Sequence, residues 1–86
     1  MSNRHSATLL ISCPDRKGLV AAISDFLCRH NGNILHADQH QDADQNLFLM
    51  RVEWALDGFD IPIAEFATHF APIAAQFQMD WRVETS

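Results

Sequence analysis

The chain has 86 residues, the length of one small domain, and 48% of them are hydrophobic, which is enough for one core and argues against disorder. Its formal net charge is −5, and its six Lys and Arg residues are scattered along the sequence. This pattern argues against binding to nucleic acid or to an anionic membrane surface, because both depend on clustered cations.

The sequence also bears on the compartment in which the chain works. It has no apolar run near the roughly 20 residues of a membrane span, and residues 1–6 lack the apolar centre of a signal peptide. We therefore expect a cytoplasmic protein. The two cysteines, Cys13 and Cys28, are expected to be reduced thiols, and without a CxxC pair they support neither a thiol metal site nor a redox motif.

The first expected element is a strand over residues 7–13, where Leu9, Ile11 and Cys13 alternate onto one face. Pro14 has no N–H to donate to a sheet and should end it. The following residue, Asp15, is a candidate N-cap for a helix.

That helix is predicted from an apolar stripe at helical spacing. Its members are Leu19, Ile23, Phe26 and Leu27. Asp25 and Arg29 are four residues apart and are expected to pair on the solvent side. Asn31 and Gly32 should stop the helix, with Gly32 as a left-handed cap.

Two strands follow, over residues 33–41 and 47–54, and the short polar segment between them predicts a hairpin. The second strand has alternating apolar residues that should face the core. These are Phe48, Met50, Val52 and Trp54.

A second helix is expected after Pro62, which suits a first turn. Its buried stripe is predicted to comprise Ile63, Phe66, Ala67, Phe70 and Ala74. Pro72 interrupts this pattern, so a kink or a new turn is expected there. A last strand over residues 79–84 should turn Met79, Trp81 and Val83 inward.

The order β-α-β-β-α-β predicts an α+β fold of the ferredoxin-like type, with a four-stranded antiparallel sheet and two helices on one face, forming a single domain over residues 1–86. This fold hosts many activities. RNA binding is disfavoured because Phe48 and Trp54 belong to the core-facing set. A metallochaperone would need a CxxC, whereas an acylphosphatase-like enzyme stays open because the first loop contains Arg16.

His36, Asp38 and His40 alternate along one strand and should therefore share a face. Two imidazoles and a carboxylate suit a divalent metal. However, successive members lie nearly 7 Å apart along a strand, so one ion cannot reach all three without help from another element. A polar solvent-facing or interface-facing strand is therefore the preferred interpretation, and no metal or cofactor is expected.

Four segments together resemble the ACT domain family. They are CPDRKGLVAAIS, NGNILHADQHQD, LFLMRVEW and FAPIAAQFQMDWR, which cover nearly the whole chain. The DRxGL and NxNI patterns resemble ACT domains in general, whereas LFLMRVEW and MDWR are similar to the N-terminal ACT domains of bacterial formyltetrahydrofolate deformylases. That family hydrolyses 10-formyltetrahydrofolate to tetrahydrofolate and formate, which serves one-carbon metabolism and purine synthesis.

The resemblance implies a regulatory rather than a catalytic role for these residues. The family's catalytic residues lie in a formyltransferase-like domain that would be expected after residue 86, so none can be placed on this chain. We expect either a part of a longer enzyme, which is the preferred interpretation, or a free-standing regulatory subunit.

The resemblance and the local chemistry together indicate an effector site. In ACT domains the matching loop and strand positions line the site at a dimer interface, which carries over to Asp15, Arg16, Gly18, Leu19, Asn33 and Ile34. Independently, the N–H groups at a helix start attract a carboxylate, Gly18 allows close approach, and Asp15 suits an ammonium group. A small amino acid, glycine or methionine by the family's association, is the expected ligand, together with a homodimer.

Simpler roles exist for each of these residues. Asp15 could serve only as a cap, Gly18 only as a turn, Asn33 only at the end of the helix, and Leu19 and Ile34 only in the core. The competing function is a dimerisation module that binds no ligand. An independent enzyme is least supported, because no nucleophile–base pair or carboxylate pair is visible in the sequence.

Overall fold

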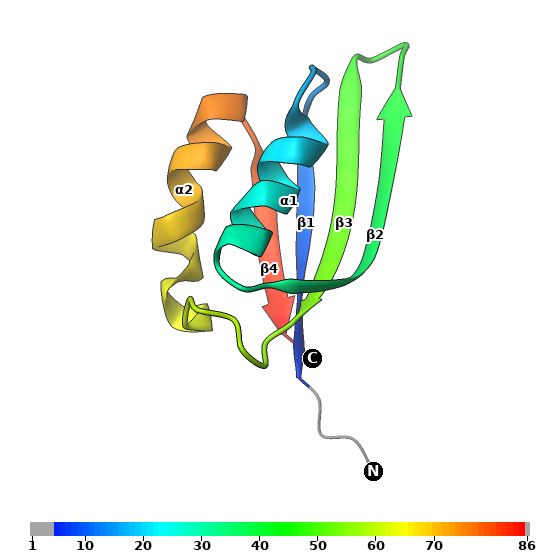
Figure 1. Cartoon of the computed structure of the whole chain (residues 1–86). Coiled ribbons are helices and arrows are strands. Elements are labelled where there is room, and N and C mark those ends of the chain that lie inside the picture. The colour runs from blue at the N-terminus through cyan, green and yellow to red at the C-terminus, as the bar shows by residue number, and fades with distance from the viewer. Residues whose placement is uncertain (1–4, 86) are drawn as a thin grey trace.

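The computed structural model describes residues 5–85 and shows the predicted order of strands and helices (Figure 1). The properties expected of residues 1–4 lie outside this range. The elements are β1 (Ser6–Pro14), α1 (Leu19–Arg29), β2 (Asn33–Asp42), β3 (Leu47–Ala55), a 3-10 turn (Ile63–Glu65), α2 (Phe66–Phe77) and β4 (Asp80–Thr85). The ferredoxin-like fold is therefore confirmed.

The four strands form one antiparallel sheet in the order β2-β3-β1-β4, and both helices lie on the same face of it (Figure 1). β2 and β3 form the expected hairpin, and β2 lies at one edge of the sheet. In the described part of the chain the other face carries no helix, so the sheet has a covered face and an open face.

The core lies between the helices and the covered face. Its strand residues are the alternating set expected from the sequence, and the stripe of α1 is buried as predicted. Phe66 is fully buried at the centre of an aromatic cluster that includes Trp54 and Phe70. Burying these large rings supplies much of the hydrophobic stabilisation that a domain of this size needs. Between residues 5 and 85, no helix is long and apolar enough to cross a membrane.

The second helix differs from its prediction at three points. Ile63 lies in the 3-10 turn and is 37% exposed, and Ala67 is also exposed, so neither belongs to the buried stripe. Phe77 is buried in their place, one turn beyond Ala74. Pro72 does not start a new element, because α2 continues through it. Pro72 has no backbone N–H, so α2 lacks one hydrogen bond there. Burial of the apolar face of the helix offsets the stability that is lost.

The end of α1 also differs from its prediction. The left-handed residue is Asn31, with φ of 64°, and not Gly32. Gly32 is instead required for close packing, because a Cβ there would lie 2.8 Å from the carbonyl oxygen of Leu27. The Gly32 N–H donates to that same oxygen at 2.8 Å, which holds the chain against the helix as it enters β2.

Candidate functional site

The loop between β1 and α1 holds Asp15 in a position that differs from the expected cap. No side chain caps α1, and the N-cap residue is Gly18. The Asp15 carboxylate instead accepts a hydrogen bond from Gln41 Nε2, at 3.2 Å and 3.3 Å to its two oxygens. The Asp15 N–H donates to the carbonyl oxygen of Asn46 at 2.9 Å. The loop is therefore tied to the β2–β3 turn, and the role of Asp15 as a helix cap is wrong.

Gly18 forms the turn into α1 with φ of 89°, a left-handed conformation that side chains adopt only with strain. A Cβ at this position would meet nothing within 4 Å, so the space beside the helix start is open. The first intrahelical bond runs from the N–H of Ala22 to the carbonyl oxygen of Gly18. The N–H groups before Ala22 have no partner within the helix and point toward its open end.

Arg16 and Leu19 have different environments in this loop, because Arg16 is exposed and Leu19 is buried. The Arg16 guanidinium lies over the ring of Phe77, 4.9 Å from its centroid, which places a cation beside the helix start. Leu19 is 2% exposed and belongs to the core. Leu19 therefore anchors the helix and does not present its side chain to solvent.

Asn33 and Ile34 lie far from this loop within the same chain. Asp15 contacts Gln41, whereas Asn33 begins the same strand. Their partners on β3, Phe48 and Ala55, are seven residues apart because the register shifts between Ile34 and His36, so Asn33 and Gln41 are about 24 Å apart. Asn33 is exposed, whereas Ile34 is partly buried against the core. One chain thus brings together Asp15, Arg16 and Gly18 but leaves Asn33 and Ile34 at the opposite end of α1.

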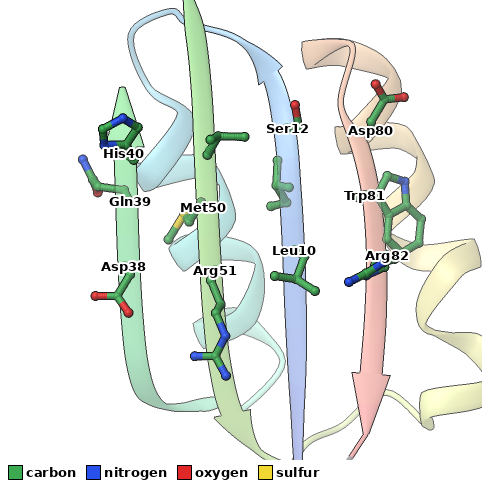
Figure 2. A pocket seen from close by; sticks show the side chains of 12 residues that line it. Leu10, Ser12, Asp38, Gln39, His40, Met50, Arg51, Asp80, Trp81 and Arg82 are labelled. Atoms are coloured by element: carbon green, nitrogen blue, oxygen red, sulfur yellow. The ribbon is translucent and has the colours of Figure 1, made fainter. Parts of the chain in front are cut away.

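The open face of the sheet carries a separate hollow of about 540 Å³ (Figure 2). Leu10 lies on its floor between the two arginines, Arg51 and Arg82, while Asp38 and Asp80 lie on the outer strands. None of the six residues predicted to bind an effector lines this hollow. The open face is therefore a second feature, distinct from the loop.

His36, Asp38 and His40 all lie on the open face, as predicted, opposite Glu53, Arg51 and Leu49 of β3. Within residues 5–85, no three His, Cys, Asp or Glu side chains are grouped closely enough to hold a metal ion. These three residues instead form the polar rim of the sheet at the β2 edge.

The two cysteines are unpaired, as expected for thiols, and differ in environment. Cys28 is exposed on α1, whereas Cys13 is buried at the end of β1. Burial raises the pKa of the Cys13 thiol above its ordinary value of 9.0, and the negative charge of Asp15 adds to this effect. Cys13 is therefore a packed neutral thiol and a poor nucleophile.

The residues that hold the loop could not be identified from the sequence. Gln41, Asn46 and Phe77 hold Asp15 and Arg16 from 26 or more residues away. Such pairings depend on the register of the hairpin and on where α2 ends.

Known proteins resemble this chain over most of its length. The ACT domain pattern matches residues 7–68. The formyltetrahydrofolate deformylase of Synechocystis is 47% identical over 81 residues, which is 94% of this chain and 28% of that protein. The deformylase of Bacillus subtilis is 35% identical over 80 residues, which is 92% of this chain and 27% of that protein.

Solved structures give the same result. The formyltetrahydrofolate deformylase of Pseudomonas syringae superposes with a TM-score of 0.93 at 40% identity, covering 99% of this chain and 28% of that chain. An ACT domain protein from Streptococcus pneumoniae, at 17% identity and a TM-score of 0.80, shares the fold, with 96% of this chain and 91% of that one covered. The chain thus spans a little over a quarter of each of these three deformylases.

Proposed function

Because the chain belongs to the ACT domain family, we propose that it is the amino-acid-sensing regulatory domain of a formyltetrahydrofolate deformylase. The observation that carries this proposal is the open start of α1. There an uncapped helix end, the Gly18 turn and the Asp15 carboxylate lie together in a loop held by its neighbours. The alternative is a dimerisation module that binds no ligand, or a free-standing ACT protein.

The chemistry of the loop fits a small amino acid. The N–H groups at the helix start and the dipole of α1 attract the ligand's carboxylate, and the Arg16 guanidinium adds positive charge nearby. Asp15 keeps a carboxylate beside the same opening for the ligand's ammonium group. The open space beside Gly18 admits a ligand close to the backbone, which suits glycine or methionine.

A second copy of the chain would complete this site. β2 is an edge strand of ten residues, and exposed edges pair readily. Antiparallel pairing of β2 with its copy, centred on Ala37, would place Asn33 of one copy beside His40 of the other and next to its Gln41, because the register of β2 shifts by one residue between Ile34 and His36. The separation of about 24 Å within one chain would then no longer matter, because Asn33 would reach the Asp15 loop of the neighbouring copy. In such an edge-paired homodimer, Asp15, Arg16 and Gly18 of one copy would meet Asn33 of the other, while Leu19 and Ile34 would support the site from the core.

The site would regulate through this interface. A ligand that bridges two copies stabilises the arrangement it binds better, and coupling of this kind is typically about 1–3 kcal/mol. The attached catalytic domains would respond to that arrangement. The hydrolysis of 10-formyltetrahydrofolate to formate and tetrahydrofolate, in the cytoplasm and in support of purine synthesis, would take place on a formyltransferase-like domain in the part of the enzyme beyond this chain.

Ligand binding is tested by calorimetry or ligand-detected NMR with glycine and methionine at millimolar concentration. Gly18→Ala should abolish binding, because the added Cβ occupies the open approach to the helix start. Gly58→Ala is the matched control, since Gly58 has φ of 82° and equally open space but lies in another loop.

Both variants should lose about 1–2 kcal/mol of stability from backbone strain. If wild-type dimer binds neither amino acid, or if both variants bind as wild type does, the sensor function is wrong and the ligand-free dimerisation module is supported.

The edge-paired dimer is tested by cysteine crosslinking. In a Cys28→Ser background, Ala37→Cys places the new thiol beside its own copy across the two-fold axis, within the 4.4–6.8 Å Cα separation that a disulfide typically needs. A crosslinked dimer is expected on non-reducing electrophoresis. Ala75→Cys on the exposed side of α2 is the control. The arrangement is wrong if neither Ala37→Cys nor the neighbouring His36→Cys and Asp38→Cys variants crosslink above that control.

A further inference from the structure

The hollow on the open face of the sheet has an apolar centre (Figure 2). Leu49 lies opposite Ser12 of β1, and Leu10 is two residues from Ser12 along the same strand, so the two leucines are diagonal neighbours. Leu49 is 38% exposed, and Leu10 is partly exposed. The volume of about 540 Å³ falls within the roughly 300–1,000 Å³ of small-molecule sites, so this centre can accept the apolar part of a small ligand.

The charges that line the hollow are balanced. Arg51 and Arg82 are matched by Asp38 and Asp80, and His40 is the one further titratable residue of the lining. A simple anion or a simple cation would therefore meet like charges as well as opposite charges. A zwitterion carries both signs on one molecule and can contact an arginine and an aspartate at the same time.

Asp38 and Arg51 lie directly opposite each other on β2 and β3, a position in which opposite charges typically attract. In the described part of the chain, however, neither side chain forms an ion pair or a side-chain hydrogen bond. Neighbouring strands lie about 4.8 Å apart, and an α-amino acid carries its ammonium and carboxylate groups on one carbon atom. An amino acid over these two strands can therefore place its ammonium group on Asp38 and its carboxylate on Arg51.

Arg82 adds a second cation on the far side of Leu10. Leu10 is paired with both Arg51 and Arg82, so the two arginines flank it on β3 and β4 (Figure 2). Arg82 Nε lies 3.2 Å from Glu84 Oε2, but these side chains are 71% and 56% exposed, so the pair is weak. The terminal N–H groups of Arg82 can still donate. A carboxylate above Leu10 is thus within reach of both arginines, which leaves the ligand's side chain to cover Leu49.

We propose that this hollow binds the zwitterion of an α-amino acid with an unbranched apolar side chain. Asp38 holds the ammonium group, Arg51 and Arg82 hold the carboxylate, and Leu49 packs against the side chain. Glycine has no side chain to cover Leu49, so the hollow discriminates against it. The inference goes beyond the loop site and does not depend on it, because none of the loop residues lines the hollow. The domain would then have two amino-acid sites of different specificity.

The probe for this site is L-norleucine, titrated into the full 86-residue chain with labelled leucine methyl groups. The methyl signals of Leu10 and Leu49 should shift in NMR spectra, with a dissociation constant in the millimolar range because the charged contacts are exposed to solvent. Glycine at the same concentrations should shift neither signal. The proposal is overturned if norleucine leaves both signals unchanged up to its solubility limit, or if glycine shifts them equally.

Two analogues of norleucine test the need for both charges. Hexanoate lacks the ammonium group, and pentylamine lacks the carboxylate. Each should bind at least about 5-fold more weakly than norleucine, because each loses one of the two charged contacts. Binding of hexanoate as tight as that of norleucine would refute the role of Asp38 and leave only an apolar surface with a cation.

Two variants test the residues that hold the charged groups. D38N and R51Q should each weaken norleucine binding about 5-fold and keep the wild-type melting temperature, since both side chains are exposed. The matched controls D25N and R29Q change an exposed pair on α1, on the other side of the sheet, and should bind as the wild type does. Unchanged affinity in D38N and R51Q would overturn the proposal.

Gly18→Ala separates this site from the loop site. The variant should keep the norleucine-dependent shifts of Leu10 and Leu49, because Gly18 does not line the hollow. Loss of these shifts in Gly18→Ala would place the ligand at the loop, which overturns the second site and leaves the sensor function intact. Shifts that persist in a chain whose loop binds no amino acid would support the hollow and count against the loop alone.

Discussion

Replacing Phe66 by alanine removes the ring at the centre of the aromatic cluster between α2 and the sheet. Phe66 is fully buried. Its ring centroid lies 5.3 Å from that of Trp54, 5.5 Å from Phe70, 5.8 Å from Phe26 and 5.9 Å from Trp81. All four neighbours lose contacts at once, and they belong to separate helices and strands, so the site cannot close by the shift of one side chain.

The expected loss is about 3–5 kcal/mol of the free energy of unfolding. A domain of this length has a total stability of about 4–13 kcal/mol, so the variant is left close to unfolding. The melting temperature should fall by about 15 °C or more, since each kcal/mol corresponds to about 4–8 °C in a small domain.

The assay is urea unfolding followed by tryptophan fluorescence, because Trp54 stacks on Phe66 and reports its removal directly. Ile63→Ala is the control. The sequence pattern groups both residues in one stripe, but Ile63 is 37% exposed and its loss should cost about 1 kcal/mol or less. Equal losses from the two substitutions would refute the placement of the helix described above.

Three further results are expected. Gly32→Ala should lower the free energy of unfolding by about 2 kcal/mol or more, because the new Cβ would lie 2.8 Å from the rigid Leu27 carbonyl oxygen. A melting temperature within about 2 °C of the wild type, which corresponds to a loss under about 0.5 kcal/mol, would contradict this. A thiol reagent at neutral pH should label Cys28 quickly and Cys13 only on unfolding, which peptide mass spectrometry resolves; rapid labelling of both would contradict the burial of Cys13. Because the pKa of Cys13 is raised, first by burial and then by Asp15, its neutral form stabilises the fold fully below pH 9.0 and this contribution is lost as pH rises further. The urea midpoint should therefore fall above that pH, and Cys13→Ala should reduce the fall.

The order of elements and most of the core could be predicted because they depend on local periodicity. Alternation in residues 47–54 indicates a strand with one buried face, and the spacing of Leu19, Ile23 and Phe26 indicates a helix with one buried stripe. Periodicity fails where an element begins, as it does at Ile63, because a 3-10 turn rotates its side chains differently from the α-helix that follows.

The arrangement of the candidate-site residues depends on the tertiary structure more than the order of the elements does. The sequence identified the residue types at the start of α1, since a Gly turn before a helix has a local signature. It could not show that Asp15 is held by Gln41 instead of capping the helix, or that Asn33 lies at the other end of β2, about 24 Å from Gln41, in the same chain. The contact of Asp15 and the position of Asn33 depend on the hairpin register and on the direction of β2. Both are decided when the whole sheet is buried beneath two helices, so no single segment of the sequence determines them.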